Sequence, residues 1–267
     1  MTTPSSRRTL SAPVLRLRVT LLGVFEARLG AGRRLRFPTK KTAALLAYLA
    51  GRAGERLPRE HLATVFWGDA EERRARQSLR HALSALRKVL ADGTRSALII
   101  DRDCVSVDPA LVEIDVVTLE RAARERRPED LTRAAMLCQR DLLEGFDVGG
   151  TLFDEWVTVK RERIRRTALE VLTLSLEHRL RTGAEQAVID AATRMLTIDP
   201  LDEAAHRALM RLFSRRGQRP RALRQYETCA RALRHEFGID PDSETQRLHE
   251  EILRAPAANA IARRRAS

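Results

Sequence analysis

Residues 71–90 carry opposite chemistry on the two faces of a predicted helix. At about 100° per residue, a helix over this segment places polar and basic side chains on one stripe. The members of this stripe are Arg73, Arg76, Gln77, Arg80, Ser84, Arg87 and Lys88. The opposite face carries Ala75, Leu79, Ala82, Leu86, Val89 and Leu90. The pattern therefore predicts a helix that buries one face in a core and presents guanidinium and amide groups outward.

The side chains of this stripe match those that read DNA. Arginine and glutamine bind the guanine and adenine edges in a major groove. A short β-pattern follows the predicted helix, at 97–100 and 104–107. A basic helix followed by a strand pair is the outline of a winged helix. A solvated charged face explains the helical pattern equally well, so this segment alone leaves both interpretations open.

The excess positive charge lies in the first part of the chain. The net charge is +13, and residues 1–110 hold 21 basic and 10 acidic side chains. Residues 111–254 hold 25 basic and 26 acidic side chains, and the last 13 residues add three arginines. This asymmetry indicates a basic domain joined to a neutral one, and a basic domain attracts a polyanion. Nucleic acid is the expected partner.

Two further features narrow the kind of polyanion. Aromatic residues make up only 4% of the chain and do not line up on a strand, which argues against RNA and single-strand modules that stack bases. No predicted helix combines a basic face with a bulky aromatic face, as membrane-surface helices do. We therefore expect double-stranded DNA as the partner and no membrane.

The first part of the chain reads as strands, then three helices, then a hairpin. Residues 1–14 are rich in Ser, Thr and Pro and are expected to be disordered. Thr39 is the expected N-cap of the first helix. The expected elements are strands from Leu15, at 25–29 and at 35–37, helices at 40–49, 59–66 and 71–90, a turn at Asp92-Gly93 and a hairpin at 97–107. We assign a winged helix-turn-helix domain to 15–109.

The remainder of the chain has an almost continuous helical pattern. The expected helices begin at the cap residue Asp115 and at Pro128, and then span 153–181, 185–196, 204–214, 220–237 and 243–253. Gly183 and Gly217 lie in the turns of two helix pairs and are 34 residues apart, which is the tetratricopeptide period. The pattern predicts an all-α tetratricopeptide-like domain over 112–254 with a concave surface for a partner, followed by a disordered basic tail at 255–267. An ordinary helical bundle is the alternative.

No pattern of an enzyme or of a metal site is present. The sequence contains no GxSxG, P-loop or GxGxxG motif. Its three cysteines are far apart, which gives no metal-ligand spacing and suits a reducing cytosol. No run approaches 18 apolar residues. We expect a protein without catalytic activity, cofactor or metal, located in the cytoplasm with the nucleoid.

Eight short segments resemble a known family. In the first part they are residues 21–25 (LLGVF), 38–42 (PTKKT), 65–69 (VFWGD) and 75–80 (ARQSLR). These resemble the N-terminal module of antibiotic-regulatory-type (SARP-like) bacterial transcription activators, a winged helix of the kind found in two-component response regulators. In the second part they are residues 153–156 (FDEW), 162–165 (ERIR), 200–202 (PLD) and 238–241 (GIDP). These resemble the companion bacterial transcriptional activator domain.

The resemblance implies how the two domains work. The helix at 71–90 is expected to enter the major groove while the hairpin at 97–107 lies along the DNA backbone. The helical domain is expected to join two protomers on direct repeats and to contact RNA polymerase. One departure concerns the tip of the hairpin, where Arg102 lies between Asp101 and Asp103. Two acids beside this arginine weaken its expected grip on phosphate.

Most residues of the expected DNA-binding set have a role that follows from the side chain. Arg76, Gln77 and Arg80 lie near the centre of the stripe and early in the helix, so they are expected to contact base edges. Lys40 and Lys41 lie at a helix N-terminus and are expected to bind phosphate, with local capping geometry as the alternative. The expected phosphate contacts on the predicted helix are Arg73, Arg74, Arg87 and Lys88. Ser84 and Arg102 complete the set.

These observations favour a sequence-specific transcription regulator that binds double-stranded DNA, and the resemblance favours an activator. One alternative is a tetratricopeptide-like adaptor that binds proteins and has no specific DNA affinity. Another is the input module of a longer signalling protein, also without specific DNA binding. A steep salt dependence of duplex binding distinguishes the regulator from the adaptor.

Overall fold

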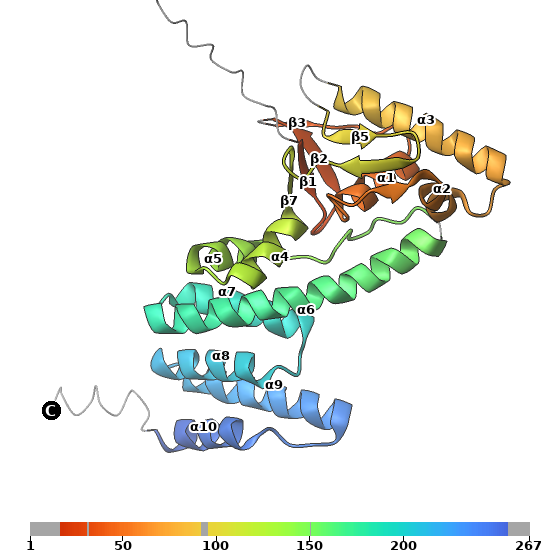
Figure 1. The fold of residues 1–267 in the computed structure, drawn as a ribbon. Coiled ribbons are helices and arrows are strands. Elements are labelled where there is room, and N and C mark those ends of the chain that lie inside the picture. Colours follow the sequence, from red (N-terminus) through yellow and green to blue (C-terminus); the bar gives the residue numbers. More distant parts are fainter. Residues whose placement is uncertain (1–16, 31, 92–95, 150, 256–267) are drawn as a thin grey trace, which may run out of the picture. The chain divides into compact units, whose positions relative to one another are not determined.

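The computed structural model describes residues 17–30, 32–91, 96–149 and 151–255 (Figure 1). The expected disordered tails, apart from residue 255, and the expected turn at Asp92-Gly93 lie outside these residues. The described chain is mainly helical, with small β elements near its N-terminal end. This confirms the expected fold class. None of the described helices is both long and apolar enough to cross a lipid bilayer.

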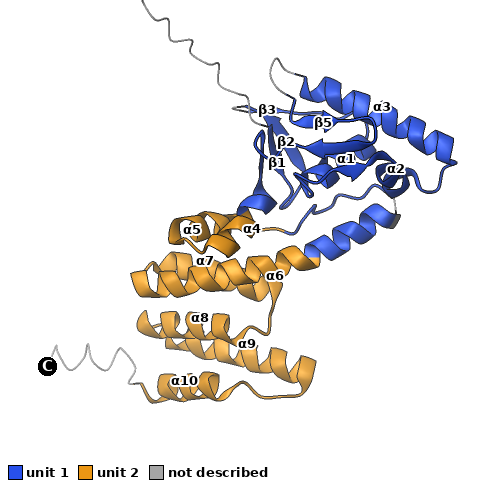
Figure 2. Ribbon diagram, viewed as in Figure 1, with its two compact units in different colours: residues 1–118, 141–161 blue, residues 119–140, 162–267 orange. Residues whose placement is uncertain are grey.

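The chain folds as two compact units (Figure 2). Unit 1 comprises residues 1–118 and 141–161, and unit 2 comprises residues 119–140 and 162–267. The division differs from the expected boundary between 109 and 112, because unit 1 also contains residues 112–118 and 141–161, which hold one strand and the starts of two helices. The packing described below explains why these segments belong to unit 1.

A four-stranded sheet forms one part of unit 1. Its strands are β1 (Leu17–Thr20), β2 (Glu26–Leu29), β3 (Arg33–Arg34) and β7 (Val112–Ile114), in the order β3-β2-β1-β7. The first three pair antiparallel, and the third begins two residues before the expected 35–37. β7 was not expected, and it pairs in parallel with β1, Leu17 opposite Val112. The buried side chains Val112 and Ile114 flank an exposed glutamate, an alternation too short to recognise in the sequence.

Asp115 anchors the end of β7 to the end of β1. Its carboxylate accepts the backbone N–H groups of Leu21 (2.9 Å) and Leu22 (2.8 Å). It also accepts the N–H of Val116, at the start of α4 (Asp115–Glu125). Asp115, expected only as a helix cap, therefore binds mainly the backbone that follows β1. Burial raises the pKa of Asp115, while these backbone hydrogen bonds act in the opposite direction.

The winged helix occupies the rest of unit 1. Three helices, α1 (Lys40–Ala50), α2 (Arg59–Trp67) and α3 (Glu72–Leu90), lie beside a sheet of β4 (Leu57–Pro58), β6 (Cys104–Val107) and β5 (Leu98–Ile100). The helices lie within one residue of the expected bounds. Thr39 caps α1 as expected, because its hydroxyl accepts the N–H of Thr42 at 3.1 Å. β5 and β6 form the expected antiparallel hairpin, which we call the wing.

An aromatic cluster joins the start of α6 (Thr151–Thr182) to the helices of unit 1. The ring of Tyr48 lies 4.7 Å from Trp156 and 5.7 Å from Phe66, between ring centroids. Phe153 lies 5.3 Å from Phe66 and is fully buried. Trp156 covers Gly51 so closely that a Cβ there would lie 2.8 Å from the indole. These contacts explain why residues 141–161 belong to unit 1.

Unit 2 is a succession of helices. It contains parts of α4 and α6 together with α5 (Pro128–Leu137), α7 (Glu185–Ile198), α8 (Glu203–Arg215), α9 (Arg219–Phe237) and α10 (Ser243–Arg254). Each matches an expected helix, and Pro128 occupies the first turn of α5 as expected. α8 packs against α7, α9 and α10 (Figure 1). Gly217 has φ +69° in the turn between α8 and α9, a conformation that favours glycine.

The two Asp-Pro turns of unit 2 share one construction. Asp202 caps α8 by accepting the N–H of Ala205, and Asp242 caps α10 by accepting the N–H of Thr245. A side chain from the following helix then binds each proline carbonyl. His206 Nε2 lies 3.0 Å from the oxygen of Pro200, and Gln246 Nε2 donates to that of Pro241 at 2.7 Å. The Ile-Asp-Pro sequence that occurs at 198–200 and again at 239–241 therefore takes part in matching hydrogen bonds at both places.

Replacing Asp115 with alanine is expected to destabilise unit 1. The change leaves the N–H groups of Leu21 and Leu22 without their acceptor, at a cost of about 2–4 kcal/mol. The free energy of unfolding, measured by chemical denaturation, checks this. Asp108→Ala is the control, because Asp108 accepts one exposed N–H, from Ala110, which water can satisfy. Equal losses in the two variants would contradict the anchoring role of Asp115.

Acidification is expected to destabilise the protein through His206. Its side chain is buried, and burial lowers its pKa. The unfolded chain therefore takes up a proton that the folded chain excludes, so stability present above about pH 6.5 is lost as the pH falls below it, by at most about 1.4 kcal/mol per pH unit. The measurement compares melting temperatures at about pH 7.5 and about pH 5.5. We expect His206→Gln to reduce this loss and His235→Gln, at an exposed position of α9, to leave it unchanged.

Candidate nucleic-acid interface

The polar stripe of α3 is exposed along its whole length. The exposed residues are Arg73, Arg74, Arg76, Gln77, Arg80, Ser84, Arg87 and Lys88. On the opposite side Leu79 and Leu86 are 1% and 0% exposed, and Ala75, Ala82 and Leu90 are also buried. Leu83 joins the buried side, whereas Val89 is only half-buried. The expected division of this helix into two faces is confirmed.

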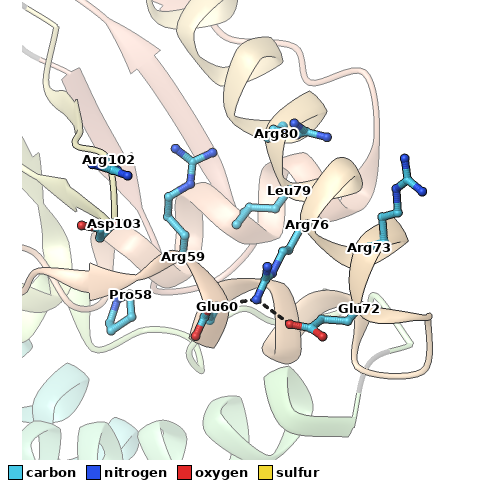
Figure 3. A pocket seen from close by; sticks show the side chains of 10 residues that line it. All are labelled: Pro58, Arg59, Glu60, Glu72, Arg73, Arg76, Leu79, Arg80, Arg102 and Asp103. Carbon is cyan, nitrogen blue, oxygen red and sulfur yellow. Dashed lines mark hydrogen bonds and ion pairs between the residues drawn. The ribbon is translucent and has the colours of Figure 1, made fainter.

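A cleft of about 660 Å³ lies beside the first half of α3 (Figure 3). It is bounded by the start of α2 and by the turn of the wing. Its lining combines five arginines and three acids with Pro58 and Leu79: Arg59, Arg73, Arg76, Arg80, Arg102, Glu60, Glu72 and Asp103. The structure thus brings together four of the expected site residues, Arg73, Arg76, Arg80 and Arg102. The others on α3 are exposed but do not line this cleft.

Arg59 lines the cleft but lies outside the DNA-binding set expected from the sequence. It is the first residue of α2, directly after Pro58, and its backbone N–H donates to the carbonyl of Asp103 at 2.9 Å. Figure 3 shows its side chain extending between the wing and α3. The helical pattern of 71–90 could not reveal a residue on another element. A basic residue at the start of a helix was the only available signal, as it was for Lys40.

Arg76 differs from its neighbours because two carboxylates hold it. Its Nη2 donates to Glu60 Oε1 at 2.8 Å and to Glu72 Oε1 at 2.5 Å (Figure 3). Glu72 lies one turn earlier on α3, while Glu60 comes from α2. Arg73 and Arg80 have no hydrogen-bonding or ion-pair partner within the described part of the chain. Of the three arginines Arg73, Arg76 and Arg80, two are therefore available to an external anion.

The charge at the tip of the wing is partly compensated. Asp101, one of the two acids that flank Arg102, forms an ion pair of 2.8 Å with Arg56. Arg102 itself is exposed and faces the cleft. Asp101 therefore opposes an incoming phosphate less than its sequence position indicated, while Asp103 remains exposed beside Arg102.

The two lysines at the start of α1 have different environments. Lys41 is half-buried, and its Nζ donates to the carbonyl of Phe66 at 2.8 Å. It also lies 5.8 Å from the centroid of the Trp67 ring. A cation is favourable there because the C-terminal end of α2 carries partial negative charge. Lys40 is exposed. The geometry thus favours the local structural role for Lys41 and leaves Lys40 as the phosphate candidate.

Replacing Lys41 with methionine is expected to lower the stability of unit 1 by about 1 kcal/mol. The change keeps an apolar stem of similar length and removes only the ammonium that binds the end of α2. Lys40→Met is the matched control, and we expect it to stay within about 0.5 kcal/mol of the wild type. Denaturant unfolding of the two variants provides the test. A smaller effect at Lys41 than at Lys40 would contradict the assignment.

Two family models match the chain. The model described as "Bacterial transcriptional activator domain" matches residues 110–253, and the model described as "Transcriptional regulatory protein, C terminal" matches residues 33–102. The first match covers more than half of the chain, and the second contains all three helices of the winged helix.

Similar proteins include two regulators. Regulatory protein AfsR of Streptomyces griseus is 27% identical over 258 residues, which are 95% of this chain and 26% of that protein. Regulatory protein AfsR of Streptomyces coelicolor is 29% identical over 236 residues, 86% of this chain and 23% of that protein. The chain spans about a quarter of the length of these relatives.

A solved structure shares the fold. It is the Mycobacterium tuberculosis protein EmbR in complex with a low affinity phosphopeptide, with a TM-score of 0.67 and 21% identity over 92% of this chain and 68% of that chain. The order of winged helix and helical domain, the two matched models and the similarity to AfsR agree with one another. The chain belongs to the SARP-type family of bacterial transcriptional activators.

Proposed function

We propose that this protein is a sequence-specific, double-stranded-DNA-binding activator whose α3 enters the major groove. The observation that carries the proposal is the gathering of Arg59, Arg73, Arg80 and Arg102 around one cleft beside the exposed face of α3. Three separate elements supply these cations: the start of α2, α3 and the wing. A duplex can engage all three at once, since a helix fits the groove while flanking elements reach the phosphates.

Within this proposal the residues divide between bases and phosphates. Arg80 and Gln77 read base edges, because they are exposed in the first half of α3. Ser84 can contact a base or a phosphate from the next turns of the same face. Phosphate contacts come from Arg59, Arg73, Arg74, Arg87, Lys88, Arg102 and Lys40. Arg76 also lies at the DNA-binding surface in this proposal. Its two carboxylate partners, however, give it a role different from that of Arg73 and Arg80.

The helical part of the chain supplies protein contacts in this proposal. Residues 15–109 act as the DNA-binding domain and residues 112–254 as the partner-binding domain, in the cytoplasm at the nucleoid. The match to the bacterial transcriptional activator domain supports this role. Two protomers bind direct repeats and the complex recruits RNA polymerase. The protein works by binding, without catalysing a reaction.

The length of the relatives favours a second candidate. Because the chain spans about a quarter of each AfsR protein, the same two domains can serve as the input module of a longer signalling protein. In that case the helical domain passes the signal within one polypeptide.

The test begins with recovery of the genomic fragments that the full chain binds. The best fragment is then titrated at several salt concentrations, as duplexes with one and with two copies of the recovered motif. We expect a steep fall of affinity with salt, with a slope of about −0.9 for each phosphate neutralised, and tighter binding to the two-copy duplex. Fragments without a common motif, or binding that is insensitive to salt, would overturn the proposal and favour the protein-binding adaptor.

Arg80→Ala is expected to weaken binding to the recovered duplex by about 5- to 150-fold and to relax selectivity at one base pair. The loss corresponds to about 1–3 kcal/mol for one bidentate contact with a base. Titration against duplexes substituted at each position locates the base pair. Arg231→Ala is the matched control, because Arg231 is an exposed arginine on α9 in unit 2. A uniform loss on every duplex would assign Arg80 to phosphate instead.

A further inference from the structure

Two glutamates, Glu60 and Glu72, hold Arg76 inside the proposed DNA-binding surface, and we call this pair the carboxylate clamp. All three side chains are exposed, with 79%, 77% and 54% of Glu60, Glu72 and Arg76 accessible. Acids in such a place oppose the phosphates of a duplex. Glu60 and Glu72 therefore lower the affinity for DNA. We ask what function of these two glutamates offsets that loss.

The clamp occupies the part of the guanidinium that base reading requires. A guanidinium binds two acceptors side by side either through Nε and Nη2 or through its two Nη nitrogens. Both arrangements use Nη2, the atom that donates to Glu60 and to Glu72. Bidentate reading of guanine O6 and N7 by Arg76 therefore requires the release of at least one glutamate.

The clamp is weak enough to be displaced. Ion pairs between exposed side chains contribute little because water and salt screen them. A guanine positioned opposite Arg76 offers two acceptors, O6 and N7, whose spacing matches two parallel N–H groups of the guanidinium. It can therefore replace a carboxylate. A base pair without such a pair of acceptors cannot, so Arg76 stays on the glutamates. The clamp also competes with phosphates for Arg76 wherever the protein rests on non-cognate DNA.

We infer that Glu60 and Glu72 are positioning residues that set the sequence specificity of the protein by withholding Arg76 from non-cognate DNA. This inference rests on the proposed function. Arg73 and Arg80, one turn to either side, have no carboxylate partner within the described residues. They supply affinity on any duplex or read bases directly, whereas Arg76 contributes only where a suitable acceptor pair displaces the clamp.

The experiment measures dissociation constants for the recovered duplex and for a scrambled duplex, with the full chain. The variants are Glu60→Gln, Glu72→Gln and the double variant. Because each removes a negative charge, we expect tighter binding to both duplexes. The gain should be larger on the scrambled duplex, so that the specificity ratio of the double variant falls about fivefold. An unchanged ratio would overturn the inference.

Glu71→Gln is the matched control for charge. Glu71 is an exposed glutamate that immediately precedes α3, and its side chain does not cap the helix. The variant is expected to bind both duplexes slightly more tightly at an unchanged ratio. A fall in the ratio as large as that of Glu72→Gln would assign the effect to net charge and overturn the inference.

The Arg76→Ala background separates positioning from folding. If the glutamates act through Arg76, replacing them in this background raises affinity for both duplexes equally and leaves the ratio unchanged. An equal drop of the ratio in both backgrounds would overturn the inference. Melting temperatures of all variants reveal any loss of packing between α2 and α3, and the ratios are compared only among variants that melt like the wild type. If the wild type shows no salt-sensitive duplex binding, the proposed function fails as well.

Discussion

The burial of one face of α3 against α1 and α2 fixes the direction of every side chain on its other face. Leu79 and Leu86 are almost fully buried, and each further residue turns by about 100°. Once these leucines are in the core, Arg73, Arg76 and Arg80 must project outward on successive turns. The stability of the winged helix and its recognition surface therefore depend on the same packing. The tie from Arg76 to Glu60 adds a second, weaker link between α2 and α3.

Long elements with local signals were predictable from the sequence, and short elements with distant partners were not. α1 was recognised from its apolar face and from Thr39, whose hydroxyl caps it, and α5 from Pro128. β4 has two residues and β7 has three, too few for an alternating pattern. Their existence depends on pairing with β6 and β1, which lie far away in the sequence. A pattern within one segment carries no information about such a partner.

The same distinction applies to the candidate site. Helical spacing predicted which residues of α3 are exposed, because exposure follows from the burial of the opposite face. It did not predict that Arg76 binds Glu60, 16 residues earlier, nor that Lys41 binds the carbonyl of Phe66. Such pairings arise only when separate helices pack. They change what a basic residue can bind. Arg76 and Lys41 have the same formal charge as Arg80 and Lys40, which have no partner among the described residues, but Arg76 and Lys41 are already engaged.

Ion pairs within the basic domain determine where on its surface the positive electrostatic potential lies. Residues 1–110 have an excess of basic side chains, yet several arginines away from the cleft have acidic partners. Arg18 binds Glu113, Arg28 and Arg34 share Glu26, and Arg52 binds Glu55. Around the cleft, Arg59, Arg73, Arg80 and Arg102 have no carboxylate partner within the described residues. These four cations lie around one cleft beside α3, and a cluster of cations orients an approaching polyanion before any base is read.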